Sequence, residues 1–81
     1  MSKNYADIYT NLQELMGRLG VEAPGVMEGF GALHAASTAD GALDTKTKEL
    51  IALAIGITVR CDGCIAYHVH DAVDAGANRQ E

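Results

Sequence analysis

The chain has 81 residues, enough for one small domain that buries only a modest share of its surface. It is 48% hydrophobic but only 5% aromatic, which is more apolar surface than a lone small helical domain easily hides, so we expect self-association. The net charge is −5 and no basic cluster is present, which argues against nucleic acid or an anionic membrane as a partner.

Two helices are predicted in the N-terminal half. The first has apolar residues at helical spacing: Ile8, Leu12, Leu15, Met16 and Leu19. This pattern predicts an amphipathic helix of about 15 residues that stops at Gly20. Pro24 suits the first turn of a second helix, which we expect to fade by Ser37. The apolar side of that helix holds Val26, Met27, Phe30 and Leu33, and three glycines would let another helix approach closely: Gly25, Gly29 and Gly31.

A third helix is predicted to begin at Asp44, because aspartate is a favoured N-cap residue. From Leu50 to Ile57 the chain is apolar on every side, and periodicity alone does not separate a buried helix from a buried strand there. The cap, the alanines at 52 and 54 and the lack of a second strand favour a helix. A helix that is apolar all round must be buried, and we expect part of that burial against another subunit.

A fourth helix is predicted from about Asp62 to Ala75, with Gly76 as its stop. Its expected core stripe consists of Ile65, Val69, Ala72 and Val73. Asn78 and Glu81 have the spacing of a capping box, which predicts the opening of a fifth helix.

Both cysteines lie in one motif, Cys61-Asp62-Gly63-Cys64, and His68 follows one turn later. Steps of three and seven residues come nearly full circle on a helix, so these three side chains share one face. A Cys-x-x-Cys pair at a helix start has a lowered thiol pKa, because free backbone N–H groups favour the thiolate, although an aspartate beside Cys61 opposes this. The spacing allows a disulfide, and His68 can move a proton to or from Cys64. We therefore interpret the motif as a thiol redox site.

The expected compartment is the cytoplasm. The first ten residues lack the apolar core of a secretory signal, and no apolar run is long enough to span a bilayer. In a reducing cytosol, two close cysteines are more often catalytic or metal-binding than a structural link. Zinc is disfavoured, because His68 and His70 point to opposite sides of a helix and a second ligand pair is missing. A thioredoxin-like site is disfavoured because the strand-helix-strand pattern is absent, so we expect no metal and no bound cofactor.

Glu49 lies near the start of the third helix, where the helix dipole alone would favour an acid. If the third and fourth helices fold back as a hairpin about Arg60, Glu49 and His68 lie at similar distances from the turn. The offset of three residues is about 4.5 Å of helix rise, which a glutamate side chain can bridge. A proton relay from Glu49 through His68 to the cysteines is therefore possible.

The other histidines and large side chains are expected to have structural roles. His34 is expected to pack against neighbours or lie at the surface, and His70 to face solvent. Tyr67 is expected to cover its helix or line an interface. Three further residues are assigned to the core: Met16, Met27 and Phe30.

The acid, the cysteine pair and the histidine have one order and spacing: Glu49, eleven residues, Cys61-x-x-Cys64, three residues, His68. This pattern resembles the signature of the alkylhydroperoxidase D-like branch of the carboxymuconolactone decarboxylase family. The likeness covers roughly residues 43–81, since the flanking residues agree as well. It implies a small all-α domain, residues 1–81, that carries the site on a helix hairpin, assembles as trimers or hexamers, and here lacks the family's C-terminal helix.

The resemblance also implies a reaction and a role for each residue. Cys64 would be the peroxidatic thiol that becomes a sulfenic acid, and Cys61 would resolve it as a disulfide. His68 and Glu49 would relay the proton that activates Cys64. The implied function is a thiol-dependent alkylhydroperoxide reductase that depends on an external dithiol reductant, such as a dihydrolipoyl protein.

Two other functions stay open at this point. One is a non-catalytic oligomeric module, a redox sensor or an accessory protein, in which the cysteine pair changes assembly or partner binding. The other is decarboxylation, which is the poorer inference because the decarboxylase branch of the family generally lacks the cysteine pair.

Overall fold

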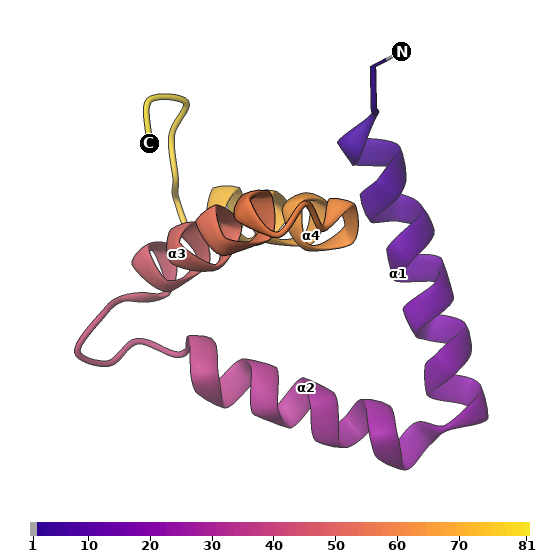
Figure 1. Cartoon of the computed structure of the whole chain (residues 1–81). Coiled ribbons are helices and arrows are strands. Elements are labelled where there is room, and N and C mark those ends of the chain that lie inside the picture. Colours follow the sequence, from indigo (N-terminus) through magenta and orange to yellow (C-terminus); the bar gives the residue numbers. More distant parts are fainter. Residues whose placement is uncertain (1) are drawn as a thin grey trace.

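The computed structural model describes residues 2–81, and over this range the chain forms four helices and no strand (Figure 1). The helices are α1 (Tyr5–Glu22), α2 (Pro24–Thr38), α3 (Thr45–Thr58) and α4 (Asp62–Asp74). The predicted all-α fold is therefore confirmed. None of the helices in the described range is long and apolar enough to cross a membrane.

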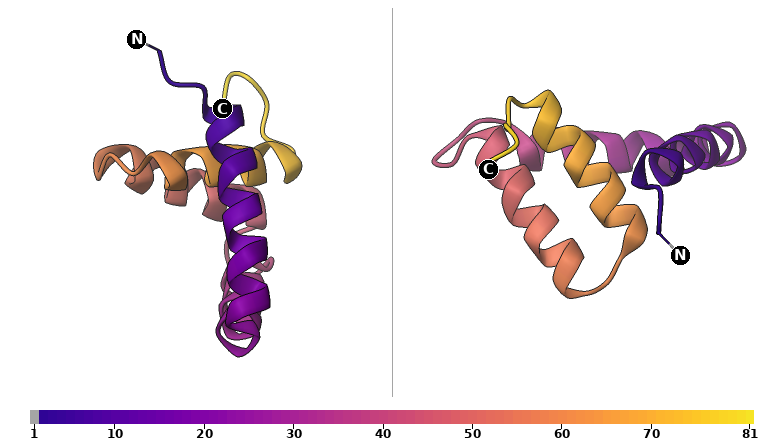
Figure 2. Two further views of the ribbon diagram at one scale, coloured as in Figure 1. Left: turned by 90° about the vertical axis from the view of Figure 1, so that its right-hand side faces the viewer. Right: turned by 90° about the horizontal axis from the view of Figure 1, so that it is seen from above.

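The helices are arranged as a hairpin and two arms. α3 and α4 run antiparallel and side by side, α1 crosses α4, and α2 leads from the far end of α1 back toward α3 (Figures 1 and 2). The molecule measures 40 × 39 × 21 Å, and its radius of gyration is 13.4 Å. A compact chain of this length would have a radius of gyration of about 12 Å. The single chain is thus flat and open, and few of its helix faces are covered.

The boundary between α1 and α2 differs from the prediction. α1 passes through Gly20 and ends at Glu22, because Pro24 lacks an N–H group and disfavours helical geometry at Ala23. The N–H of Ala23 closes the helix on the carbonyl of Leu19 at 2.7 Å. Gly20 instead faces α2, where a Cβ atom would lie 3.9 Å from the Cβ of Met27. The predicted stop at Gly20 is wrong, while the predicted start of α2 at Pro24 is confirmed.

The ends of the hairpin helices follow local rules. Asp44 is the N-cap of α3 and accepts a hydrogen bond from the Thr47 N–H at 2.8 Å, as predicted. α4 ends at Asp74 and is followed by Gly76, whose φ of 101° lies in the left-handed region that glycine adopts without strain. The N–H of Ala77 bonds the carbonyl of Ala72, and that of Gly76 bonds Val73, which is a Schellman motif.

A capping box follows α4. The N–H of Asn78 donates to Glu81 Oε1, and the N–H of Glu81 donates to Asn78 Oδ1, both at 3.0 Å. This reciprocal pair is the arrangement that the sequence predicts at a helix start. The fifth helix itself stays a prediction.

The buried core of the single chain lies between α3 and α4 and is small. Its members within the described range are Glu49, Gly56, Ala66 and Ala72. The predicted core stripe of α4 is wrong for Val69 and Val73, which are exposed, as is Phe30 of α2 at 52%.

The apolar faces of α2 and α3 are largely uncovered in the single chain. Three α3 residues that were predicted to be buried are exposed: Ile51, Ile55 and Ile57. Within residues 2–81 of the single chain, no heavy atom of another element lies within 4 Å of a Cβ placed at Gly25, Gly29 or Gly31, so no helix of the same chain approaches α2 closely there. The reason is the open arrangement, in which each helix packs on one side only. Burial of these faces against another subunit stays a prediction.

Gly56 lies where α3 and α4 approach closely, and it yields a stability prediction. A Cβ there would lie 3.1 Å from Cys64 Cβ and 3.6 Å from two backbone atoms of α4. We expect Gly56→Ala to lower the free energy of unfolding by about 1–2 kcal/mol, because the helices must separate. The matched control is Gly29→Ala in the open middle of α2, which should raise stability by about 0.5–1 kcal/mol. Urea denaturation of the two variants checks the opposite signs, and equal effects would contradict the close contact.

The Asp44 cap predicts a pH-dependent contribution to stability. Hydrogen bonds from Thr47 lower the pKa of Asp44. A carboxylate with a lowered folded-state pKa stabilises the fold above its unfolded-state pKa, and this contribution is lost as pH falls through the folded-state value. Asp44→Ala should therefore lower the unfolding temperature at pH 7 and have little effect once the pH is below that value. Asp44→Asn, which keeps a capping side chain, is the control, and a pH-independent effect of Asp44→Ala would contradict the explanation.

Candidate redox site

The turn between α3 and α4 places the cysteine pair. Arg60 has a φ of 58°, an uncommon left-handed conformation for a residue other than glycine, and the N–H of Cys61 bonds the carbonyl of Gly56 at 3.0 Å. The chain therefore reverses within three residues. Because Gly56 has no side chain, the first turn of α4 can lie directly against α3 at Cys64.

Cys61 and Cys64 form a disulfide with their Cα atoms 5.2 Å apart. Cys61 is the N-cap of α4, and its Sγ accepts a hydrogen bond from the Cys64 N–H at 3.2 Å. The pair thus lies at a helix start, as the sequence predicts. The positive end of the helix dipole and this N–H group stabilise negative charge on Cys61 Sγ when the pair is reduced.

Glu49 and His68 meet across the hairpin. Glu49 Oε2 lies 2.6 Å from His68 Nδ1, the contact expected from their positions relative to the turn. Glu49 is only 1% exposed, and a buried carboxylate requires a partner of this kind. The contact fixes the imidazole orientation and leaves Nε2 as the nitrogen that can exchange a proton elsewhere.

A cavity of about 320 Å³ opens beside the disulfide. Both cysteines and His68 line it. The rest of its wall comes from residues of α1, α2 and α4: Leu12, Met16, Phe30, His34, Gly63 and Tyr67. The assignment of Phe30 to the core is corrected here, because this half-exposed ring forms part of the cavity wall. A small molecule that reaches the disulfide would therefore meet mainly apolar side chains.

Asp62, which stands between the cysteines, has a partner of opposite charge. Its carboxylate lies 2.9 Å from Lys3 Nζ, and the Tyr5 hydroxyl donates to it at 3.5 Å. The hydrogen bond to Asp62 and the negative charge of Asp62 raise the pKa of Lys3, so the Lys3 ammonium stays charged. Lys3 thus offsets part of the unfavourable effect that Asp62 has on a thiolate at Cys61.

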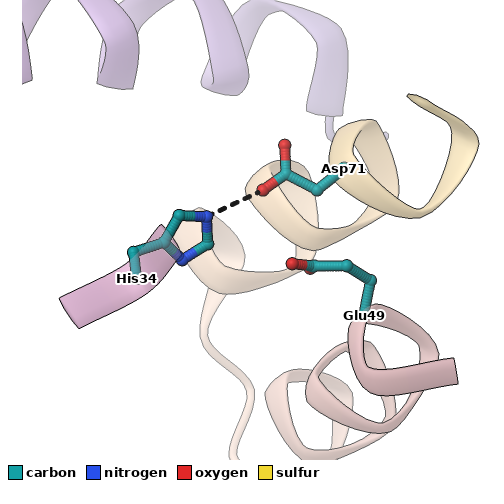
Figure 3. A group of neighbouring side chains, drawn as sticks. All are labelled: His34, Glu49 and Asp71. Carbon is teal, nitrogen blue, oxygen red and sulfur yellow. Dashed lines mark ion pairs between the residues drawn. The ribbon is translucent and has the colours of Figure 1, made fainter. Parts of the chain in front are cut away.

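Two further residues of the site were not predicted from the sequence. His34 was expected to have a packing or surface role, yet its Nε2 lies 3.5 Å from Asp71 Oδ2, and both side chains face Glu49 (Figure 3). No sequence signal pointed to this group, because α2 and α4 are far apart in the chain.

His70 is half-exposed and stacks on Tyr9 with ring centroids 4.1 Å apart, so solvent covers only part of it.

Tyr67 lies between His34 and His68. Its ring makes edge contacts with His34 and His68, with centroid distances of 6.0 and 6.2 Å. Burial raises its pKa, and the charge of Asp71 adds to the effect. The phenol therefore stays protonated at neutral pH and can donate a hydrogen bond into the cavity. The prediction that it merely covers its helix was incomplete.

The fold and the site together define an all-helical protein with a Cys-x-x-Cys disulfide on a helix hairpin. The model of the Carboxymuconolactone decarboxylase family matches residues 24–81. A crystal structure of the apo form of a carboxymuconolactone decarboxylase family protein from Legionella pneumophila superposes with a TM-score of 0.88 at 39% identity. The match covers 98% of this chain and 70% of that protein. The chain therefore belongs to the carboxymuconolactone decarboxylase family.

Similar proteins occur in other bacteria. An uncharacterized protein of Haemophilus influenzae is 38% identical over 72 residues, which are 89% of this chain and 64% of that protein. Uncharacterized protein 4 in the cox locus of Paracoccus denitrificans is 36% identical over 66 residues, 82% of this chain and 60% of that protein. The chain thus spans a little under two thirds of the length of these relatives.

Proposed function

We propose that this chain is a thiol-dependent hydroperoxide reductase of the alkylhydroperoxidase D-like type. The observation that carries the proposal is the grouping of three features: a Cys-x-x-Cys disulfide and a Glu49–His68 pair on one hairpin, and a cavity beside them that opens on the sulfurs. Membership of the family and the signature spacing support the same activity.

The proposed reaction begins with the reduced pair. The Cys64 thiolate attacks the terminal oxygen of the hydroperoxide, the O–O bond breaks, and the alcohol leaves after it takes up a proton. Cys64 is then a sulfenic acid, which the Cys61 thiolate attacks to form the disulfide, and the hydroxide that leaves takes up a proton to become water. An external dithiol, such as a dihydrolipoyl protein, returns two electrons and two protons by thiol–disulfide exchange.

His68 and Glu49 are the proposed proton relay. The imidazole would accept the proton of the Cys64 thiol and return it to the leaving alkoxide, while the Glu49 carboxylate orients the ring and stabilises its charged form. Cys64 is assigned as the attacking thiol by the family resemblance. The Cys64 N–H that bonds Cys61 Sγ favours a thiolate at Cys61, which suits the resolving step.

The substrate proposed is a small organic hydroperoxide. The cavity of about 320 Å³ is lined mainly by apolar side chains, including Leu12, Met16 and Phe30. Such a lining favours binding of the alkyl part of a hydroperoxide in the cavity. No bound cofactor is required, because the reduced cysteine pair itself supplies the two electrons. The cytoplasm is the proposed compartment, since thiols are kept reduced there.

We also propose that the chain works as a homo-oligomer, a trimer or hexamer. Large apolar side chains are exposed on every helix, among them Leu19, Leu33, Ile55 and Val73. Monomeric proteins rarely leave so many large apolar side chains in water, so we expect other copies of the chain to pack against these side chains. Sedimentation velocity of the purified chain tests this assembly.

Thiol titration tests the proposed activity. The protein is reduced, freed of reductant, and mixed with one equivalent of cumene hydroperoxide. We expect two thiols to be lost per chain and mass spectrometry to locate a new Cys61–Cys64 disulfide. No peroxide-dependent thiol loss above the background of Cys64→Ser would reject the proposal.

A redox-responsive module without turnover is the second candidate. It is favoured by one observation: Cys64 lies against Gly56, so the disulfide lies at the contact between α3 and α4, whose outer faces are exposed and apolar. Reduction of the pair would then change the packing of these faces. Sedimentation of the oxidised and reduced forms distinguishes the candidates, because equal assembly in both forms would count against the sensor.

A further inference from the structure

We propose that His34, Glu49 and Asp71 bind a divalent first-row transition cation such as Zn²⁺. One ligand atom from each side chain lies within 4.8 Å of the other two. The three residues come from α2, α3 and α4, and their polar ends converge on one point (Figure 3). The sequence predicts no metal site, because nothing in it places His34 near the hairpin.

The donor geometry fits such an ion with small side-chain movements. Zinc lies about 2.0–2.2 Å from nitrogen and oxygen ligands, so two ligands of one tetrahedral ion are separated by about 3.3–3.6 Å. Ligand atoms at 4.8 Å or less therefore need to approach one another by at most about 1.5 Å. His34 and Asp71 are 32% and 22% exposed and have room to turn, whereas Glu49 is fixed by burial. One imidazole nitrogen and two carboxylate oxygens suit Zn²⁺ or Mn²⁺.

The Glu49 carboxylate gives independent support. Its side chain is 2% exposed, and Oε2 is occupied by His68. No group within residues 2–81 donates a hydrogen bond to the other oxygen, Oε1, and the carboxylate points toward His34 and Asp71 (Figure 3). A carboxylate oxygen with unused lone pairs that faces an imidazole and a second carboxylate is a ready ligand.

The electrostatic surroundings also favour a cation. The cluster borders an open cavity of about 670 Å³ with five carboxylates on its walls: Asp40, Asp44, Glu49, Asp71 and Asp74. The one lysine of this wall, Lys46, is paired with Glu81 at 2.7 Å. The lining thus has a net negative charge that attracts a cation, and the cavity gives it an entry path. Cys61 and Cys64 line the separate cavity of about 320 Å³, so their sulfurs are not needed as metal ligands.

The test is titration of Zn²⁺ into the oxidised protein by isothermal calorimetry. In this form both sulfurs are in the disulfide, so no thiolate competes for the metal. We expect one Zn²⁺ per chain, and at least tenfold weaker binding for His34→Gln and for Asp71→Asn. The matched control is Asp74→Asn, which removes a carboxylate of the same cavity wall that is outside the cluster and should change affinity less than threefold.

Three outcomes would overturn the proposal. They are no binding by the unmodified chain, binding by His34→Gln and Asp71→Asn as tight as that of the unmodified chain, and a loss in Asp74→Asn as large as theirs. If a variant fails to fold by circular dichroism, imidazole NMR of the unmodified chain decides: Zn²⁺ must shift the His34 ring nitrogens, and unshifted ones reject the site. The test uses neither peroxide nor free thiols, so its result is independent of the proposed reductase activity.

Discussion

Replacing Cys64 by serine is expected to slow hydroperoxide reduction by at least about a thousandfold, because the variant lacks the attacking sulfur. Cys61→Ser is expected to keep a single turnover, because Cys64 can still attack the peroxide. That turnover should end at a sulfenic acid on Cys64, since no second thiol is present to resolve it. The two variants therefore separate the steps of the proposed reaction.

The measurement is rapid mixing with cumene hydroperoxide followed by dimedone trapping of sulfenic acid and mass spectrometry. The two variants serve as controls for each other, because both remove the disulfide and differ only in which sulfur remains. A dimedone adduct on Cys61 of Cys64→Ser, formed as fast as the adduct on Cys64 of Cys61→Ser, would contradict the assignment. The attacking role would then move to Cys61, whose Sγ accepts the helix N–H.

Replacing Glu49 by glutamine is expected to slow thiol oxidation by roughly 10²-fold. The amide has nearly the same size as the carboxylate and its oxygen can still accept a hydrogen bond from His68 Nδ1, so the hairpin should remain folded. What is lost is the negative charge that stabilises a protonated His68, which the proposed relay needs. The effect should therefore appear in the chemical step, with little change in secondary structure.

Stopped-flow measurement of thiol loss across pH 6 to 9 checks this expectation. The matched control is Asp62→Asn, because it removes an acid beside the cysteines that is paired with Lys3 and lies outside the relay. We expect that variant to react at a similar or higher rate, since it removes a negative charge next to a thiolate. An unchanged rate in Glu49→Gln, or an equal loss in Asp62→Asn, would show that Glu49 has only a structural role.

Features within a few residues of one another were predictable from the sequence alone. Asp44 caps α3, Pro24 starts α2 and Gly76 ends α4, because each depends on hydrogen bonds or backbone angles of its own turn. The closeness of the two cysteines follows from their spacing at the start of α4.

The contact between Glu49 and His68 was also predictable, although 19 residues separate them. The turn about Arg60 joins two helices directly, so the distance of each residue from the turn determines which side chains meet. A short hairpin has only one register, and counting residues was enough to find it.

The sequence by itself thus determined the four helices, the Asp44 cap, the cysteine pair and the contact between Glu49 and His68 across the hairpin. Only the tertiary structure decided that His34 faces Glu49 and Asp71, that Phe30 lines the cavity, and that the apolar face of α3 is uncovered in one chain. Amphipathic spacing shows which side of a helix is apolar, but not what packs against it. That choice depends on helix crossings between residues far apart in the chain, and local preferences do not encode them.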